Sequence, residues 1–150
     1  MKVKCIAIGN RIMGDDSIGS KVLEQLSSEL EKEEIKVIFA ETDTNYALSK
    51  IDDGDLLLIF DSTYFNITPG TVTFTPIEEA LTRELCPIYS QHEPNLITLL
   101  KNYKKSVRGY IVGIEVEKIY FSLVLSESLE EKFIDICKEI RQFIYDVRRQ

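Results

Sequence analysis

The fold is decided by the run Leu56-Leu57-Leu58-Ile59-Phe60, which Asp61 follows directly. Five consecutive apolar residues are typical of a strand that is buried on both faces, as in a parallel sheet with helices on either side. The run stops at Asp61, so we predict that this carboxylate lies at the carboxyl end of a buried strand. Ligands bind outside the carboxyl ends of strands in such sheets, which makes Asp61 a candidate site residue. The other interpretation is a turn-forming aspartate that accepts bonds from nearby backbone N–H groups.

The segments before this run alternate between strand and helix patterns. Residues 2–8 and 35–40 have strand patterns, and a short helix is predicted near 46–51. Between the first two strands, a helical stripe of apolar residues comprises Ile18, Val22, Leu26 and Leu30. The order strand–helix–strand–helix–strand predicts an α/β domain in three layers, with a mostly parallel sheet between two helical layers.

The connection after Asp61 is too short for another crossover helix. Only eight residues, 62–69, precede the strand pattern at 71–74, whereas a crossover between parallel strands takes at least about a dozen. We therefore predict that the strand at 71–74 runs antiparallel to the strand at 56–60, as the second arm of a hairpin.

The rest of the chain adds two helices and one core strand. A polar stretch extends to Glu93, and the patterns then predict a helix at 94–103 and a strand at 110–114. Residues 120–125 are apolar and fit either a loop or a short strand. Ser128 and Glu131 have the spacing of a capping box, which opens the terminal helix. The apolar stripe of that helix comprises Phe133, Ile136, Ile140, Phe143, Ile144 and Val147.

The composition is that of one globular domain spanning residues 1–150, with 44% hydrophobic and 29% charged residues. A formal net charge of −7 repels phosphate backbones and argues against a nucleic-acid partner. No apolar run approaches the roughly 20 residues of a membrane span, and the N-terminus has no signal-peptide cleavage region, so we expect no membrane association. The three cysteines are odd in number and irregularly spaced, which favours reduced thiols in a cytoplasmic protein. We also expect a monomer.

The segment 9–19, GNRIMGDDSIG, joins the first strand to the first helix. Its glycines suggest a phosphate-binding loop, but the Lys-Ser/Thr pair and the Gly-x-Gly-x-x-Gly pattern are both absent. Asp15 and Asp16 would repel a phosphate, which disfavours a flavodoxin-like phosphate or cofactor module. One of them can cap the helix while the other points into the crevice. If the strand order is 2-1-3, Asp16 and Asp61 lie together where the connections diverge to opposite faces.

His92 is the only histidine of the chain and lies just before the helix predicted at 94–103. Packing of that helix on the sheet would bring its N-terminal loop to the same carboxyl edge. Asp16, Asp61 and His92 would then offer two carboxylates and one imidazole, a set that suits a divalent transition metal such as nickel or zinc. The alternative is a solvated loop histidine.

Nucleophilic catalysis has weaker support in the sequence. Cys86 lies six residues before His92, which permits a thiol–imidazole pair, but no spacing rule requires one. Cys5 and Cys137 fall on apolar faces and are expected in the core. Three serines neighbour the candidate site outside any Gly-x-Ser-x-Gly elbow, namely Ser17, Ser62 and Ser90.

Five sequence elements occur in an order and spacing that together are specific. They are Ile8-Gly9-Asn10 with GDDSIG at 14–19, LIFDS at 58–62, His92 with Leu96 and Leu100, Val112-Gly113-Ile114, and Leu125-Ser126. In this order they resemble the signatures of the nickel–iron hydrogenase maturation proteases, and the resemblance extends over most of the chain.

The resemblance implies a cytoplasmic endopeptidase that removes a short C-terminal extension from the hydrogenase large-subunit precursor after nickel has entered it. It implies a twisted five-stranded sheet flanked by helices, in agreement with the pattern above. The catalytic and metal-coordinating set of the family falls on Asp16, Asp61 and His92, as in an aspartyl protease that recognises nickel. That nickel is carried by the substrate rather than held as a permanent cofactor, and zinc or cadmium can replace it in a crystal.

Two other functions remain open from the sequence. One is a related peptidase with another protein substrate, such as a spore protein, and the other is a non-catalytic maturation chaperone that inspects the metal. The attacking group also stays open. Water can attack a metal-polarised carbonyl with Asp16 or Asp61 as base, or nickel can act only as a recognition handle.

Overall fold

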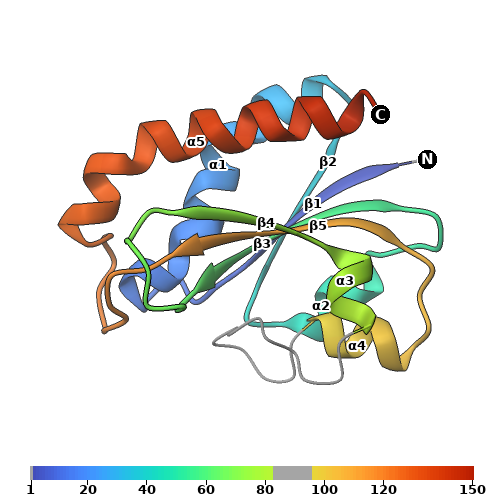
Figure 1. Ribbon diagram of the computed structural model, residues 1–150, viewed down its shortest axis with the longest axis horizontal. Helices are drawn as coiled ribbons and strands as arrows, with labels where there is room; N and C mark the ends of the chain where they lie inside the picture. Colours follow the sequence, from blue (N-terminus) through green and yellow to red (C-terminus); the bar gives the residue numbers. More distant parts are fainter. Residues whose placement is uncertain (1, 83–95) are drawn as a thin grey trace.

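Five strands form one sheet in the order β2-β1-β3-β5-β4 (Figure 1). The computed structural model describes residues 2–82 and 96–150 of the chain. The strands are β1 (Val3–Ile8), β2 (Lys36–Glu41), β3 (Leu56–Thr63), β4 (Val72–Pro76) and β5 (Arg108–Glu115). All neighbours are parallel except β4, which pairs antiparallel with β5. The predicted α/β class, the 2-1-3 order and the single antiparallel strand are confirmed.

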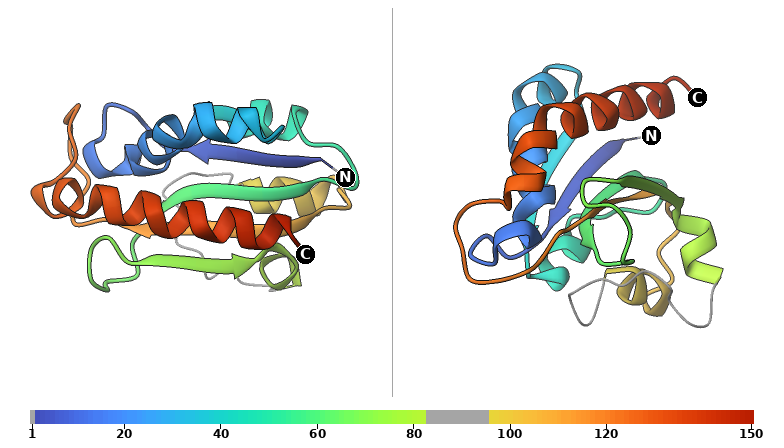
Figure 2. Two further views of the ribbon diagram at one scale, coloured as in Figure 1. Left: turned by 90° about the horizontal axis from the view of Figure 1, so that it is seen from above. Right: turned by 60° about the vertical axis from the view of Figure 1, so that its left-hand side comes forward.

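Helices cover both faces of the sheet (Figures 1 and 2). One layer contains α1 (Ile18–Lys32) and α5 (Glu127–Arg148), and the other contains α2 (Thr44–Ser49), α3 (Ile77–Thr82) and α4 (Leu96–Asn102). Alternate residues of β3 divide between the layers, because successive side chains of a strand point to opposite faces. Leu58 and Phe60 pack with α1 and α5, whereas Leu57 and Ile59 pack with the three short helices. The apolar run is therefore buried on both sides, as the sequence predicted.

Two predictions about β3 and β4 are wrong. β3 does not stop at Asp61 but continues to Thr63, because Ser62 and Thr63 still pair with Ile114 and Glu115 of β5. β4 runs antiparallel to β3, but it is not its hairpin partner, because β5 lies between them. Eight residues easily cross the two strand spacings involved, about 10 Å in total. The more apolar β5 thereby takes the interior position between β3 and β4, and β4 lies at the edge.

Two further features differ from the sequence prediction, and one that the sequence left open is decided. The stretch after β4, predicted as polar and irregular, begins with α3, whose Ile77 and Ala80 are buried. The N-cap of α5 is Ser126 instead of Ser128, and its side chain accepts a bond from the backbone N–H of Leu129. Residues 120–125 form no strand beyond one isolated bridge between Met13 and Ser122. The predicted apolar stripe of α5 is confirmed, since its members are buried or packed against the core.

A buried ion pair lies at the other end of β1, away from the carboxyl edge. The ammonium group of Lys4 contacts the carboxylates of Asp55 at 2.6 Å and Asp52 at 3.0 Å, and it donates to the carbonyl of Lys50 at 2.8 Å. The side chains of Lys4 and Asp55 are 3% and 5% exposed. This pair fixes the turn that leads into β3.

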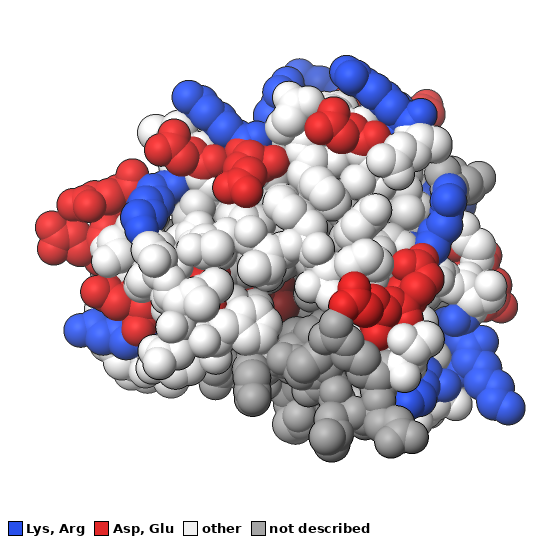
Figure 3. Space-filling view, viewed as in Figure 1, with Lys and Arg blue, Asp and Glu red and all other residues white. Residues whose placement is uncertain are grey.

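Charge on the surface is mixed. On the face drawn in Figure 3, the described Lys and Arg side chains are interspersed with Asp and Glu and form no continuous basic surface. Within the described residues, every helix is too short or too polar to cross a membrane.

Candidate active site

The loop between β1 and α1 folds back onto the end of its own strand. Gly9 has a φ of +151°, and a Cβ at this position would lie 2.2 Å from the carbonyl oxygen of Asp16. Only glycine permits this approach. The return of the loop buries Asp16, and the backbone N–H of Asn10 donates to its Oδ2 at 2.8 Å. Asp16 is thereby held at the carboxyl end of β1, as predicted.

Close packing between α1 and β3 brings Asp16 to the neighbouring strand. A Cβ on Gly19 would lie 3.1 Å from the carbonyl oxygen of Phe60, so the first turn of α1 rests directly on the backbone of β3. Two residues further along β3, the hydroxyl of Ser62 donates to Oδ1 of Asp16 at 2.5 Å. Each carboxylate oxygen of Asp16 therefore accepts at least one hydrogen bond from the described residues.

Asp61 precedes Ser62 and is also buried, with 6% exposure. Its Oδ1 accepts the backbone N–H of Ser62 at 2.8 Å. By strand alternation its side chain lies on the face of Ile59, which packs with α4, whereas Ser62 lies on the face of α1. Asp16 and Asp61 thus approach the same strand edge from opposite faces of the sheet, and Ser62 bonds to both. Both residues lie at the switch point between β1 and β3, and the convergence of their carboxylates on one ion stays a prediction.

The third predicted member of the site, His92, lies outside the described residues, as do Cys86 and Ser90. Within residues 2–82 and 96–150, no group of three or more His, Cys, Asp and Glu side chains could hold a metal ion. The three-residue metal set therefore stays a prediction.

Asp15 does not cap a helix, which corrects the capping interpretation of the aspartate pair. Neither α1 nor the short 3-10 helix Gly14–Ser17 has a side-chain cap. Asp15 is fully buried and accepts bonds from the backbone N–H and hydroxyl of Ser126, at 2.7 and 2.8 Å, and from the N–H of Glu117 at 3.0 Å. It therefore ties both ends of the segment 117–126 to the loop that carries Asp16.

The segment 117–126 is an exposed apolar loop beside the candidate site (Figures 1 and 2). Its backbone pairs with the loop after β1, since Gly14 N–H donates to Ser122 and Ser122 N–H donates to Ile12. Several apolar side chains project from this region to solvent, namely Ile12, Tyr120, Phe121, Leu123 and Val124. Sequence reasoning left this stretch undecided because its apolar residues do not alternate.

Glu115 was also missed by the sequence analysis. Its carboxylate is 1% exposed and accepts the hydroxyl of Thr63 and the backbone N–H groups of Phe65 and Asn66, at 2.9–3.0 Å. It closes the turn that follows β3. The available signal was its position directly after the apolar run 110–114, which parallels that of Asp61 after 56–60.

The two described cysteines are unsuited to nucleophilic attack. Burial raises the pKa of the Cys5 thiol to about 12 and that of Cys137 to about 11, so both are protonated at neutral pH. Both are free thiols in the core, as predicted.

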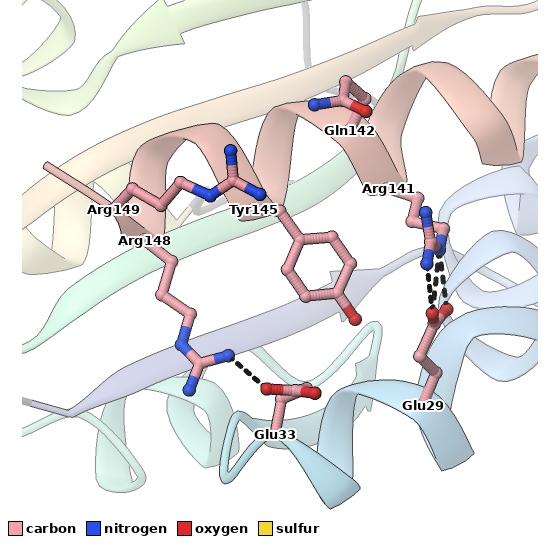
Figure 4. Close-up of a pocket in the computed structure, with 7 residues that line it drawn as sticks. All are labelled: Glu29, Glu33, Arg141, Gln142, Tyr145, Arg148 and Arg149. Carbon is pink, nitrogen blue, oxygen red and sulfur yellow. Dashed lines mark hydrogen bonds and ion pairs between the residues drawn. The ribbon is translucent and has the colours of Figure 1, made fainter.

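A cleft of about 510 Å³ lies between α1 and α5, on the face of the sheet that these two helices cover (Figure 4). Two of the arginines that line it are already paired, Arg141 with Glu29 and Arg148 with Glu33. The cleft therefore offers no free cationic centre at these two positions, and it is separate from Asp16 and Asp61.

Comparisons with known proteins agree with this arrangement. The family model HycI, described as hydrogenase maturation protease, matches residues 20–143. The hydrogenase maturating endopeptidase HybD from E. coli has a similar structure, with a TM-score of 0.76 at 19% identity, covering 98% of this chain and 94% of that one. The [NiFe] hydrogenase maturation protease HybD from Thermococcus kodakarensis gives 0.73 at 23% identity, covering 95% and 99%.

The hydrogenase 2 maturation peptidase from Thaumarchaeota archaeon SCGC_AB-539-E09 has a TM-score of 0.65 at 22% identity and covers 97% of each chain. The search of curated proteins found no match. The three structures show a shared fold, and the family model spans most of the sequence, including all but the first two residues of α1 and all strands after β1. The chain belongs to the hydrogenase maturation protease family.

Proposed function

We propose that the protein is an endopeptidase that removes the C-terminal extension of a nickel-loaded hydrogenase large-subunit precursor. The observation that carries the proposal is the pair Asp16 and Asp61, which Ser62 connects at the carboxyl edge of β1 and β3. In a member of this family, a buried carboxylate pair at the switch point of the sheet is the natural position for the reaction.

Nickel is part of the substrate in this proposal. Two carboxylates and an imidazole are oxygen and nitrogen donors of the kind that bind divalent transition metals, and we assign these roles to Asp16, Asp61 and His92. His92 precedes α4 by four residues in the sequence, and α4 packs on the sheet face to which Asp61 belongs. Zinc or cadmium would fit the same donors.

The carboxylates can contribute to the reaction in two ways. In the first, Asp16 or Asp61 takes a proton from water, which attacks the scissile carbonyl while the substrate's metal polarises it. In the second, the pair and His92 only recognise nickel and so position the peptide bond. A reduced, cytoplasmic environment is part of the proposal and agrees with the free thiols of Cys5 and Cys137.

The decisive experiment incubates nickel-loaded precursor with the protein and measures the precursor's mass. We expect Asp16→Asn, Asp61→Asn and His92→Ala each to lower the cleavage rate at least about 100-fold, as loss of an acid–base or metal-binding group does. Asparagine is chosen for the aspartates because both are buried and the amide keeps their volume. Cys86→Ala is the control and should keep full activity.

Each remaining outcome points to a different function. Metal-free precursor that is cut as fast as the loaded form would show that nickel is not recognised. Binding of the loaded precursor without any loss of mass would indicate a maturation chaperone. An inactive Cys86→Ala together with an inactive His92→Ala would indicate a thiol–imidazole peptidase.

A further inference from the structure

Ser62 bonds to both candidate carboxylates, to one through its backbone and to the other through its side chain. It is fully buried at the point where β3 continues past Asp61. Its backbone N–H bonds to Asp61 at 2.8 Å and its hydroxyl bonds to Asp16 at 2.5 Å. Strand alternation explains the division, since Asp61 and Ser62 point to opposite faces and only the hydroxyl is directed to α1.

The bond to Asp16 has the geometry of a strong, charge-assisted one. A hydroxyl that donates to an ionised carboxylate is typically about 2.5–2.7 Å from it. The second oxygen of Asp16 is held by the N–H of Asn10 at 2.8 Å, so two donors from different segments fix the plane of the carboxylate.

We propose that Ser62 is a positioning residue that orients the Asp16 carboxylate toward nickel, an inference that rests on the proposed function. Mutation of a residue that hydrogen-bonds to a metal ligand typically lowers metal affinity 10–100-fold, because such a residue fixes the orientation of the ligand before the ion binds. Ser62 acts through Asp16 and does not itself touch the metal or the substrate.

The test measures binding of nickel(II) chloride to the isolated protein by titration calorimetry, well below the melting temperature of each variant. Ser62→Ala should weaken nickel binding about 10-fold or more, because Asp16 loses a donor. Ser62→Cys has a somewhat larger side chain that leaves no cavity but donates only weakly, so it should show a similar loss. Ser62→Thr keeps the hydroxyl and should restore most of the affinity.

Ser20→Ala is the matched control. Ser20 is also fully buried on the α1 side, and among the described residues its hydroxyl has no hydrogen-bond partner. The same chemical change at Ser20 should therefore leave nickel affinity within about 2-fold of the wild type.

The failures are distinguishable. Nickel affinity that is equal in the wild type, Ser62→Ala and Ser62→Cys, but is lost in Asp16→Asn, would overturn the role of Ser62 alone. A wild type that binds no nickel, or an Asp16→Asn variant that binds it normally, would overturn the proposed metal site and the role of Ser62 with it. Loss in Ser62→Ala and Ser62→Cys with recovery in Ser62→Thr supports the proposal.

Discussion

Acidic residues that are adjacent in sequence have different roles in this protein, one structural and one at the candidate site. Asp15 and Glu115 are fully buried and accept several bonds each, which hold backbone segments in place. Asp16 and Asp61 are the candidate site residues. The sequence and the family resemblance pointed to Asp16, but they did not show what Asp15 does, because its role depends on contacts with Glu117 and Ser126, more than 100 positions away.

The first prediction at this scale concerns Lys4. Burial tends to lower its pKa, but the bonds to Asp55 and Asp52 outweigh burial and raise the pKa above the ordinary 10.5. Lys4→Met leaves Asp55 buried without its cation and should lower the free energy of unfolding by about 3–5 kcal/mol in urea denaturation. Lys2 is exposed and lies two residues before Lys4, so the control variant Lys2→Met should change this free energy by less than about 0.5 kcal/mol.

The same lysine predicts a dependence on pH. Because its pKa is higher in the folded state, its contribution is complete below the unfolded pKa near 10.5 and declines as pH rises through the folded value. Urea denaturation between pH 9 and about 12 should therefore show a decline that is smaller in Lys4→Met. An equal decline in both proteins would exclude Lys4 as its source.

The second prediction concerns Asp15. Both carboxylate oxygens of Asp15 accept hydrogen bonds, so in Asp15→Asn the NH₂ group of the amide would face a donor that it cannot accept from. The free energy of unfolding should therefore fall by about 2–3 kcal/mol. Hydrogen exchange of residues 117–126 should quicken at the same time. Asp135→Asn, the same change on the exposed face of α5, is the control, and equal exchange in both variants would show that Asp15 does not anchor the segment.

At the scale of elements, the position of α1 on β3 depends on one glycine. Gly19→Ala would gain up to about 1 kcal/mol from helix propensity. The added methyl would meet the carbonyl oxygen of Phe60 at 3.1 Å, and forcing a packed helix from a strand costs about 1–3 kcal/mol. We expect a net loss of thermal stability, whereas Ser20→Ala, the next residue, should be neutral or stabilising. A higher melting temperature for Gly19→Ala would show that α1 can shift away from β3 at little cost.

Elements with a continuous apolar or periodic pattern were predicted well from the sequence, and so were the short helices α2 and α4, whereas α3 was missed. The run 56–60 and the stripe of α5 each contain enough apolar residues to fix a buried strand and a helix. The helix α3 was missed because only Ile77 and Ala80 of its six residues are buried. The insertion of β5 between β3 and β4 could not be read from loop length, because eight residues allow either pairing.

At the scale of the molecule, both edges of the sheet resist pairing with another copy. β2 exposes Lys36 and Glu41 at its two ends, and β4 has only five residues and ends at Pro76, which lacks an N–H. Together with the net charge of −7, this predicts a monomer. Light scattering after size exclusion should give 17.2 kDa, and twice that mass would show that another surface, such as the apolar loop at 117–126, self-associates.

The adjacency of Asp15 and Asp16 limits how the gene can change. The segment between Gly9 and Gly19 has fixed ends, because Gly9 lies against Asp16 and Gly19 lies against Phe60. An insertion or deletion of one codon between Gly9 and Asp15 would shift the two aspartates by one place, so that the wrong carboxylate would meet Ser62 or Ser126. Substitutions can be tolerated at the exposed positions of this segment, but its length cannot drift. Natural variants should therefore carry substitutions in this segment but no insertions or deletions.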